Sequence, residues 1–239
     1  MNPKKIKAKF AKKTNPRIGL IVLSTDVMIE KDFLKILSSK PVDLFVNRIT
    51  NYNPVTAENL SKMTQNITSV TANILPGEKV DCIVYGCTSG TIVSGFENIR
   101  KKVNLAKPEA LVTAPSIAAL NALKKKNIKK VSIVTPYIKS VNDEVVNFFK
   151  RNNFEVTSNT YFDIESDLDI GKVDQEKLYE TLSKIDHNNA QALFVSCTSL
   201  PVLNIIEKLE KKLVRQLIFH VLAFTLEKIL VLWGMQGAL

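Results

Sequence analysis

Short apolar runs alternate with longer amphipathic segments along most of the chain. The runs are rich in β-branched residues, which is typical of buried strands. We expect strands at residues 18–24, 42–49, 80–85, 110–113, 131–135, 154–161 and 191–196. Apolar residues at helical spacing predict helices at residues 27–38, 56–72, 91–103, 116–126, 138–151, 174–185 and 201–212.

This alternation predicts an α/β fold in which parallel sheets are covered by helices on both faces. Because the pattern starts again in the second half, we expect two similar domains, each a parallel sheet flanked by helices. Ligands of such folds bind at the carboxyl ends of the strands, which places the expected active site in the cleft between the domains. The expected divisions are a basic tail at 1–16, a first domain at 17–114, a second domain at 115–213 and a C-terminal segment at 214–239.

The sequence Cys-Thr-Ser follows an apolar run twice, at residues 87–89 and 197–199, and we expect a helix to begin at once after each copy. A cysteine on such a turn lies beside unpaired backbone N–H groups, which stabilise a thiolate or a bound carboxylate. We expect Cys87 to be a thiolate and Cys197 to stay protonated, because one thiolate disfavours a second one nearby. Cys82, inside a predicted strand, is expected to be a core residue.

Composition and charge argue against several kinds of protein. The formal net charge of the 239 residues is +10, but the lysines concentrate in the tail and around residues 124–130. Aromatic residues make up only 7% of the chain and do not interleave with these basic runs, so we expect no nucleic acid as partner. Three cysteines and two histidines without zinc-type spacing argue against a disulfide framework and a metal site.

The two ends of the chain bear on its location. The basic tail is not followed by an apolar stretch of the signal-peptide type, so we expect a cytoplasmic protein whose tail is dispensable. At the other end, His220, Glu227 and Lys228 interrupt the apolar residues before the roughly 20 that a membrane span requires. We therefore expect no membrane as partner.

Five motifs follow one another along the chain, at residues 17–26, 47–50, 86–91, 134–137 and 196–198. In this order they resemble the motifs of maleate cis-trans isomerases and arylmalonate decarboxylases, a branch of the aspartate/glutamate racemase superfamily. The resemblance covers about residues 17–213 and implies a cofactor-free enzyme with two similar α/β domains that acts on a small carboxylate. Because residues 214–239 depart from the family pattern, we hypothesise that this segment results from a frameshift.

The resemblance also assigns roles to single residues. Cys87 matches the cysteine that acts as nucleophile or base in the first domain, and Cys197 matches the cysteine that acts as acid in the second. Thr88, Ser89 and Tyr137 match groups that hydrogen-bond the substrate carboxylate. Hydroxyl and N–H groups in such positions would stabilise an enediolate or a carbanion. Thr88 and Ser89 are also ordinary helix-capping residues, and the two roles are compatible.

Asp26 and Thr198 belong to the same motifs and complete the expected substrate-binding set, to which we add no cofactor and no metal. Asp26 departs from the maleate isomerases, which have asparagine at this position. A carboxylate there would repel a dicarboxylate unless it were protonated or hydrogen-bonded. A substrate related to amino acids therefore stays open, as it does for similar proteins of ectoine-utilisation gene clusters.

The presence of both Cys87 and Cys197 favours isomerase or racemase chemistry, because the related decarboxylases usually keep only the second cysteine. We therefore expect a cofactor-independent isomerase or racemase of a small carboxylate or dicarboxylate. Two alternatives stay open, an arylmalonate-type decarboxylase and a catalytically inactive paralogue that binds a small carboxylate. The expected partner is the small carboxylate itself, and a homo-oligomer stays open.

Overall fold

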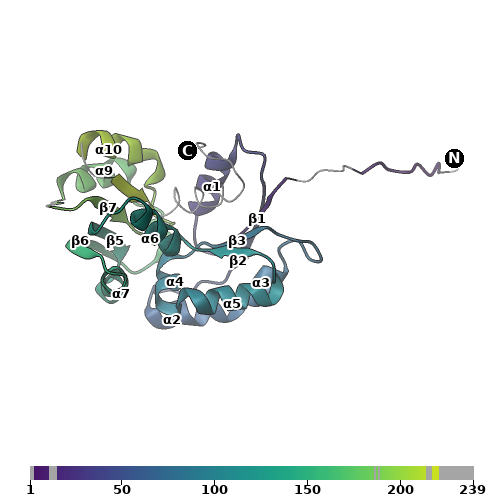
Figure 1. Cartoon of the computed structure of the whole chain (residues 1–239), viewed down its shortest axis with the longest axis horizontal. Coiled ribbons are helices and arrows are strands. Elements are labelled where there is room, and N and C mark those ends of the chain that lie inside the picture. The colour runs from purple at the N-terminus through teal and green to yellow at the C-terminus, as the bar shows by residue number, and fades with distance from the viewer. Residues whose placement is uncertain (1–2, 11–14, 186, 188, 214–216, 221–239) are drawn as a thin grey trace.

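The computed structural model describes residues 3–10, 15–185, 187, 189–213 and 217–220 of the chain (Figure 1). It contains two parallel sheets, one in each half, with the strand orders β2-β1-β3-β4 and β6-β5-β7-β8. The predicted α/β fold, with two similar parallel sheets flanked by helices, is confirmed. The strands are β1 (Arg17–Leu23), β2 (Asp43–Ile49), β3 (Cys82–Tyr85), β4 (Leu111–Thr113), β5 (Lys130–Tyr137), β6 (Glu155–Ile164), β7 (Ala192–Val195) and β8 (Leu217–His220).

Helices connect the parallel strands and cover the sheets (Figure 1). Short 3₁₀ turns lie at η1 (Thr64–Asn66) and η2 (Leu203–Ile205). The α-helices are α1 (Ile29–Leu37), α2 (Ala57–Met63), α3 (Ile67–Ala72), α4 (Thr88–Ser94), α5 (Phe96–Ala106), α6 (Pro115–Lys125), α7 (Lys139–Arg151), α8 (Asp167–Ile170), α9 (Gln175–Lys184) and α10 (Ile206–Leu213).

The inner strands are buried on both faces, which explains their nearly continuous runs of Val and Ile. In β1 every residue after Arg17 is buried, and in β5 every residue after Lys130 is buried. On one face of the first sheet, the side chains of β1 pack against Phe33 of α1. A second hydrophobic cluster joins Tyr85 of the first half to Phe194 of the second, so the halves share a continuous core.

Two predicted helices are divided, each by a local cause. The predicted helix 91–103 is split into α4 and α5 at Gly95, whose φ of +77° only glycine adopts easily. The predicted helix 56–72 is split into α2 and α3 by η1. Neither break alters the order of strands, so both leave the sheet topology as expected.

Strand β8 was not predicted, and it lies inside the segment 214–239 that we expected to depart from the family pattern. It pairs in parallel with β7, with Ala192 opposite Leu217, and completes the second sheet. Residues 217–220 of that segment therefore belong to the fold. The frameshift hypothesis otherwise concerns residues 214–216 and 221–239, which lie outside the described residues.

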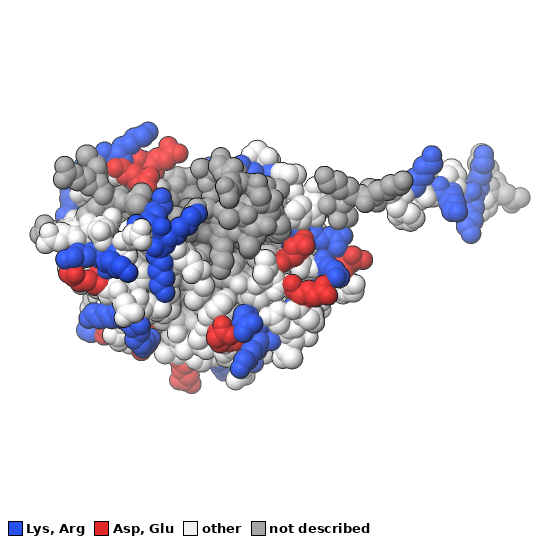
Figure 2. Space-filling view, viewed as in Figure 1, with Lys and Arg blue, Asp and Glu red and all other residues white. Residues whose placement is uncertain are grey.

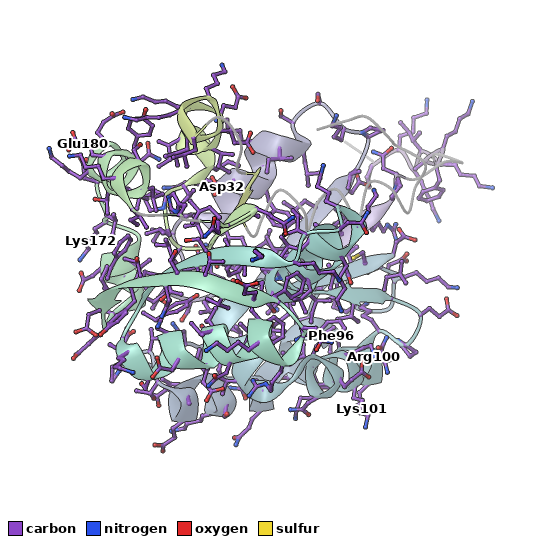
Figure 3. The ribbon with its side chains drawn as sticks, turned by 60° about the vertical axis from the view of Figure 1, so that its left-hand side comes forward. Asp32, Phe96, Arg100, Lys101, Lys172 and Glu180 are labelled. Carbon is purple, nitrogen blue, oxygen red and sulfur yellow. The ribbon has the colours of Figure 1, made fainter. Side chains whose placement is uncertain are left out.

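On the face shown in Figure 2, positively and negatively charged side chains lie next to one another. Figure 2 shows Lys and Arg along the extended N-terminal residues and, elsewhere on this face, basic side chains beside acidic ones. In Figure 3, Arg100, Lys101, Lys172 and Glu180 lie at the periphery of the molecule. In the part of the chain that the structure describes, no helix is long and apolar enough to cross a membrane.

Candidate active site

The two Cys-Thr-Ser segments meet at one small cavity between the halves. Cys87 follows β3 and Cys197 follows β7, and both cysteines are free and buried. The cavity has a volume of about 10 Å³, which is room for about one water molecule. Its lining comes from both halves: Leu23, Asn51, Val55, Leu60, Cys87, Thr88, Ser89, Tyr137, Asp167, Cys197 and Thr198.

The first turn is held by the helix that follows it. Cys87 caps α4, and its Sγ accepts a hydrogen bond from the backbone N–H of Gly90 at 3.2 Å. A side chain at position 90 would not fit, because a Cβ there would lie 2.8 Å from the Cys87 Sγ. Thr88 Oγ1 is buried and has no hydrogen-bond partner among the described residues. A buried hydroxyl on a cavity wall without a partner indicates a place for a polar ligand.

The second turn is held by side chains of both halves. Thr198 Oγ1 donates to Asp26 Oδ2 at 2.7 Å, and Ser199 Oγ donates to Asp167 Oδ1 at 3.0 Å. Residues 198–200 form a turn and a bend, and Cys197 has a φ of +87°. A 3₁₀ turn, η2, follows at Leu203, and the chain becomes α-helical only at Ile206. The expectation of a helix directly after this turn was wrong, since Pro201 and Val202 lie in no helix.

Both thiols are protonated at neutral pH. The pKa of Cys87 is raised to about 12, chiefly by burial and also by the charges of Asp167 and Asp26, while hydrogen bonds from Gly90 and Ser89 lower it. Burial likewise raises the pKa of Cys197 well above its ordinary value. The expected thiolate at Cys87 was therefore wrong for this closed cavity, because removal from water outweighs the N–H group at the helix start.

Tyr137 brings a neutral O–H group to the cavity. It ends β5 and is buried, and its hydroxyl accepts a hydrogen bond from Ser196 Oγ at 3.2 Å. Burial is the largest cause that raises the Tyr137 pKa well above its ordinary value, and Cys197 adds to it. The phenol stays protonated and can donate a hydrogen bond to a bound anion.

Asp26 supports the site and does not line the cavity. Its Oδ1 accepts the backbone N–H groups of Met28 and Ile29 at 2.8 and 2.9 Å, which fixes the start of α1. Its Oδ2 accepts the hydroxyl of Thr198 from the other half. Asp26 therefore braces the second turn, whereas the other sequence-predicted residues, Cys87, Thr88, Ser89, Tyr137, Cys197 and Thr198, share the cavity wall.

Asp167 lies on the cavity wall and was missed by the sequence reasoning. It begins α8 just after β6, and its Oδ2 accepts a hydrogen bond from Thr25 Oγ1 of the first half at 2.7 Å. Its pKa is raised to about 6, chiefly by burial and also by the charge of Asp26, while the hydrogen bonds from Thr25 and Ser199 lower it. The predicted strand ended at residue 161, whereas β6 continues to Ile164, so the sequence did not place Asp167 close to a strand end as it did the two cysteines.

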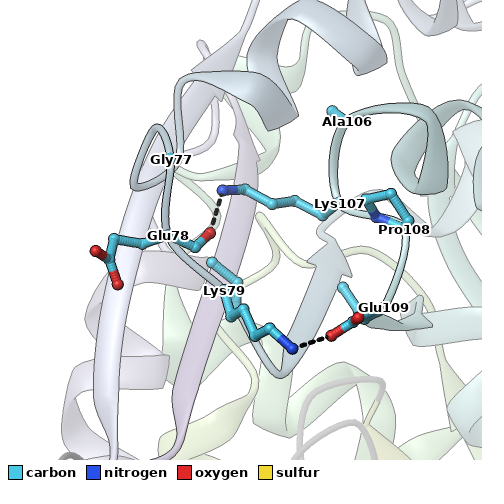
Figure 4. A pocket seen from close by; sticks show the side chains of 9 residues that line it. Gly77, Glu78, Lys79, Ala106, Lys107, Pro108 and Glu109 are labelled. Carbon is cyan, nitrogen blue, oxygen red and sulfur yellow. Dashed lines mark hydrogen bonds and ion pairs between the residues drawn. The ribbon is translucent and has the colours of Figure 1, made fainter.

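A larger hollow lies elsewhere on the first half, with a volume of about 340 Å³. Figure 4 shows it between the segments 77–80 and 106–110, where the Lys107 Nζ donates to the carbonyl oxygens of Leu75 and Glu78 at 2.8 and 2.7 Å. The Lys107 ammonium group already binds two backbone carbonyl oxygens, and none of the described residues that line the hollow is a cysteine. Among the described residues, no group of three His, Cys, Asp or Glu is placed to hold a metal ion.

Comparisons with known proteins agree with this arrangement. The family model for arylmalonate decarboxylase matches residues 44–231. The match passes Leu213, so the end of the resemblance was placed too early in the sequence. The maleate isomerase of Geobacillus stearothermophilus is 26% identical over 211 residues, which are 82% of this chain and 84% of that protein.

Two solved structures share the fold. A variant of the Nocardia farcinica maleate cis-trans isomerase with a covalently bound succinylcysteine intermediate has a TM-score of 0.83 at 20% identity, covering 92% of this chain and 93% of the other. A double variant of arylmalonate decarboxylase in the liganded form has a TM-score of 0.81 at 17% identity, covering 93% and 94%. The resemblance inferred from the five motifs is confirmed.

Proposed function

The chain belongs to the arylmalonate decarboxylase family, and from this premise we propose that it is a cofactor-independent isomerase or racemase of a small carboxylate. The observation that supports this most directly is the shared cavity, which two thiols from different halves line together. A substrate between them would have one sulfur on each side. Cys87 and Cys197 are the proposed catalytic residues.

Proton transfer at the carbon next to the carboxyl group is one route. The Cys87 thiolate takes the proton of the C–H bond, and the bonding electron pair moves into the carboxyl group to form an enediolate. Thr88 Oγ1 is without a partner and free to bind this anion, together with Ser89 and Tyr137. Cys197 then donates its S–H proton to the opposite face and is left as the thiolate, so protons and charge balance.

Addition to a double bond is the second route that the same groups allow. The Cys87 thiolate bonds to one alkene carbon, and the electron pair of the π bond moves through the other carbon into its carboxyl group as an enediolate. After rotation about the resulting single bond, this pair re-forms the double bond, the C–S bond breaks and Cys87 leaves again as the thiolate. A structure of the Nocardia farcinica relative carries a covalently bound succinylcysteine intermediate, which supports this route for a substrate with a double bond.

Access to the site requires the wall of the cavity to open. A cavity of about 10 Å³ is too small for any carboxylate with several carbon atoms. Opening also admits water, which brings the pKa of Cys87 back toward its ordinary value and lets the thiol ionise. The Gly90 N–H and Ser89 hydroxyl then stabilise the thiolate that the substrate meets.

Decarboxylation is the second candidate, because the family model is named for it. The presence of a thiol on each side of the cavity favours the isomerase, since a decarboxylase needs only one proton donor. We further propose a cytoplasmic location, in line with the three cysteines, Cys82, Cys87 and Cys197, which form no disulfide bond. The assembly state and the two domain boundaries stay predictions.

Replacement of each sulfur tests the function. Wild type, Cys87→Ser and Cys197→Ser are incubated in heavy water with a panel of small dicarboxylates, amino acids and arylmalonates, and proton NMR follows exchange, isomerisation and loss of carbon dioxide. Both variants should lose turnover, and Cys197→Ser should accumulate a covalent adduct visible by mass spectrometry if the addition route operates. Cys82→Ala is the matched control, because Cys82 is buried in β3 away from the cavity wall and its loss should leave turnover in place. Near wild-type turnover by both serine variants would disprove the two-cysteine mechanism.

A further inference from the structure

We propose that Asp167 makes this site selective for a small carboxylate that also carries a positively charged nitrogen, in preference to a dicarboxylate of the same length. This inference rests on the proposed function, since it concerns the substrate of the same cavity. It names a specificity-determining residue that touches the bound molecule through its carboxylate.

The geometry of Asp167 provides the first support. Its two oxygens accept one hydrogen bond each, from Thr25 at 2.7 Å and from Ser199 at 3.0 Å. A carboxylate has about four acceptor positions, so each oxygen keeps capacity for another donor. The backbone N–H of Asp167 donates to the Asn53 side chain at 3.3 Å, which helps to hold the residue in place. Asp167 is thus a fixed anion on the wall with room for one more N–H group.

The charges around the cavity provide the second support. Of the described residues that line it, none is Lys, Arg or His. Arg48 lies behind the neighbouring loop, but its guanidinium donates to the carbonyl oxygens of Leu23 and Asp26 and pairs with Glu30 at 2.7 Å. No described cation is therefore available to balance a second negative charge on the substrate next to Asp167.

Hydroxyl donors from both halves complete the match. Thr88 Oγ1 of the first half lacks a partner among the described residues, and Tyr137 of the second half presents a neutral O–H, so these groups suit one carboxylate. Asp167, also on the second half, suits an ammonium group. A dicarboxylate would place its second anion beside Asp167 in a site removed from water, where like charges repel strongly. The polar groups of the wall therefore fit a substrate with one negative and one positive end.

Two probes that differ in one group test this selectivity. Succinate and aspartate have the same carbon chain and two carboxylates, but aspartate carries an ammonium group. Isothermal titration at pH 7.5 should give wild type a dissociation constant for aspartate about 10²-fold lower than for succinate, as expected for one buried charge pair. Alanine and propionate provide the same comparison without the second carboxylate.

Asp167→Asn keeps the shape of the side chain and removes its charge. It should abolish most of the preference, chiefly by weakening the binding of aspartate and alanine. Asp169→Asn is the matched control on the same short helix, because Asp169 is exposed and pairs with Lys172 at 2.7 Å. That control should bind like wild type.

Equal or tighter binding of succinate by wild type would overturn the inference, and so would an unchanged preference in Asp167→Asn. These readouts measure binding, so they are independent of turnover. A wild-type protein that prefers aspartate but catalyses no exchange in heavy water would contradict the proposed function and leave this inference standing. A protein that turns over dicarboxylates through both cysteines and shows no preference for an ammonium group would support the proposed function and contradict this inference.

Discussion

The two Cys-Thr-Ser turns have the same sequence and different supports. The first continues into α4, whose Gly90 N–H binds the Cys87 sulfur, and it leaves Thr88 Oγ1 without a hydrogen-bond partner among the described residues. The second does not continue into a helix, and its Thr198 hydroxyl is taken up by Asp26 across the junction of the halves. The two threonines therefore have different roles. Thr88 can bind a ligand, whereas Thr198 links the two halves through its hydrogen bond to Asp26.

This difference shows why a repeated motif does not by itself assign equal functions. The spacing of both motifs after a parallel strand brings them to the same cavity. Their hydrogen-bond partners come from elsewhere in the chain, since Asp26 and Thr198 are 172 residues apart. The same substitution made in both turns separates the two tasks.

The largest expected effect in this comparison belongs to Thr88→Val. Valine has the shape of threonine without the hydroxyl. The turnover rate of the variant should therefore be about 10²–10³-fold lower than that of wild type, the usual loss for one oxyanion donor. Its thermal stability should be unchanged or slightly higher, because the lost hydroxyl is buried without a partner. Steady-state kinetics and thermal melting measure the two quantities, and a stability loss with intact turnover would reverse the assignment.

Thr198→Val should show the opposite balance. It removes the donor to Asp26 Oδ2 and leaves that buried oxygen with one partner fewer, so we expect a loss of about 1–3 kcal/mol of unfolding free energy. Denaturant titration of wild type and both valine variants gives the comparison. If Thr198→Val were as stable as wild type, the second turn would not depend on this contact.

The smallest expected effect is the pH dependence of stability that arises from Asp167, the carboxylate that binds the Ser199 hydroxyl. The folded-state pKa of Asp167, about 6, lies above the unfolded value near 3.8, so its cost to stability is absent at low pH and grows as pH rises to about 6. At pH 7.5, Asp167→Asn should melt about 2–4 °C higher than wild type, which corresponds to about 1 kcal/mol of unfolding free energy. Near pH 4 the two proteins should melt at the same temperature. Asp32, whose pKa burial also raises to about 6, is present in both proteins and cancels. A constant difference at all pH values would mean that Asp167 carries no burial cost.

Much of the fold follows from local patterns. The predicted strands 18–24 and 42–49 differ from β1 and β2 by one residue at their ends, because buried β-branched runs leave few alternatives. β8 was missed because no turn signal separates it from the apolar residues around it. Its strand character depends on the open edge of β7, which a sequence does not display.

The site residues were predictable where a reactive or polar side chain belongs to a motif at the end of a strand. Cys87 and Thr88 stand together at the end of a strand, and the motif found both. Asp167 stands in an unremarkable polar stretch, and its proximity to Thr25 arises from packing across 142 residues. The protonation of Cys87 was mispredicted for a related reason, since its burial comes from residues of both halves that pack around the cavity.

The small volume around the two sulfurs has a consequence for the durability of the protein. Peroxide attacks thiolates that it can reach, and here both sulfurs are protonated and enclosed. Under the opening proposed above, oxidation is confined to the open form of the cavity. The rate at which peroxide inactivates the protein then follows the population of that open form, and a ligand that keeps the cavity closed protects both thiols.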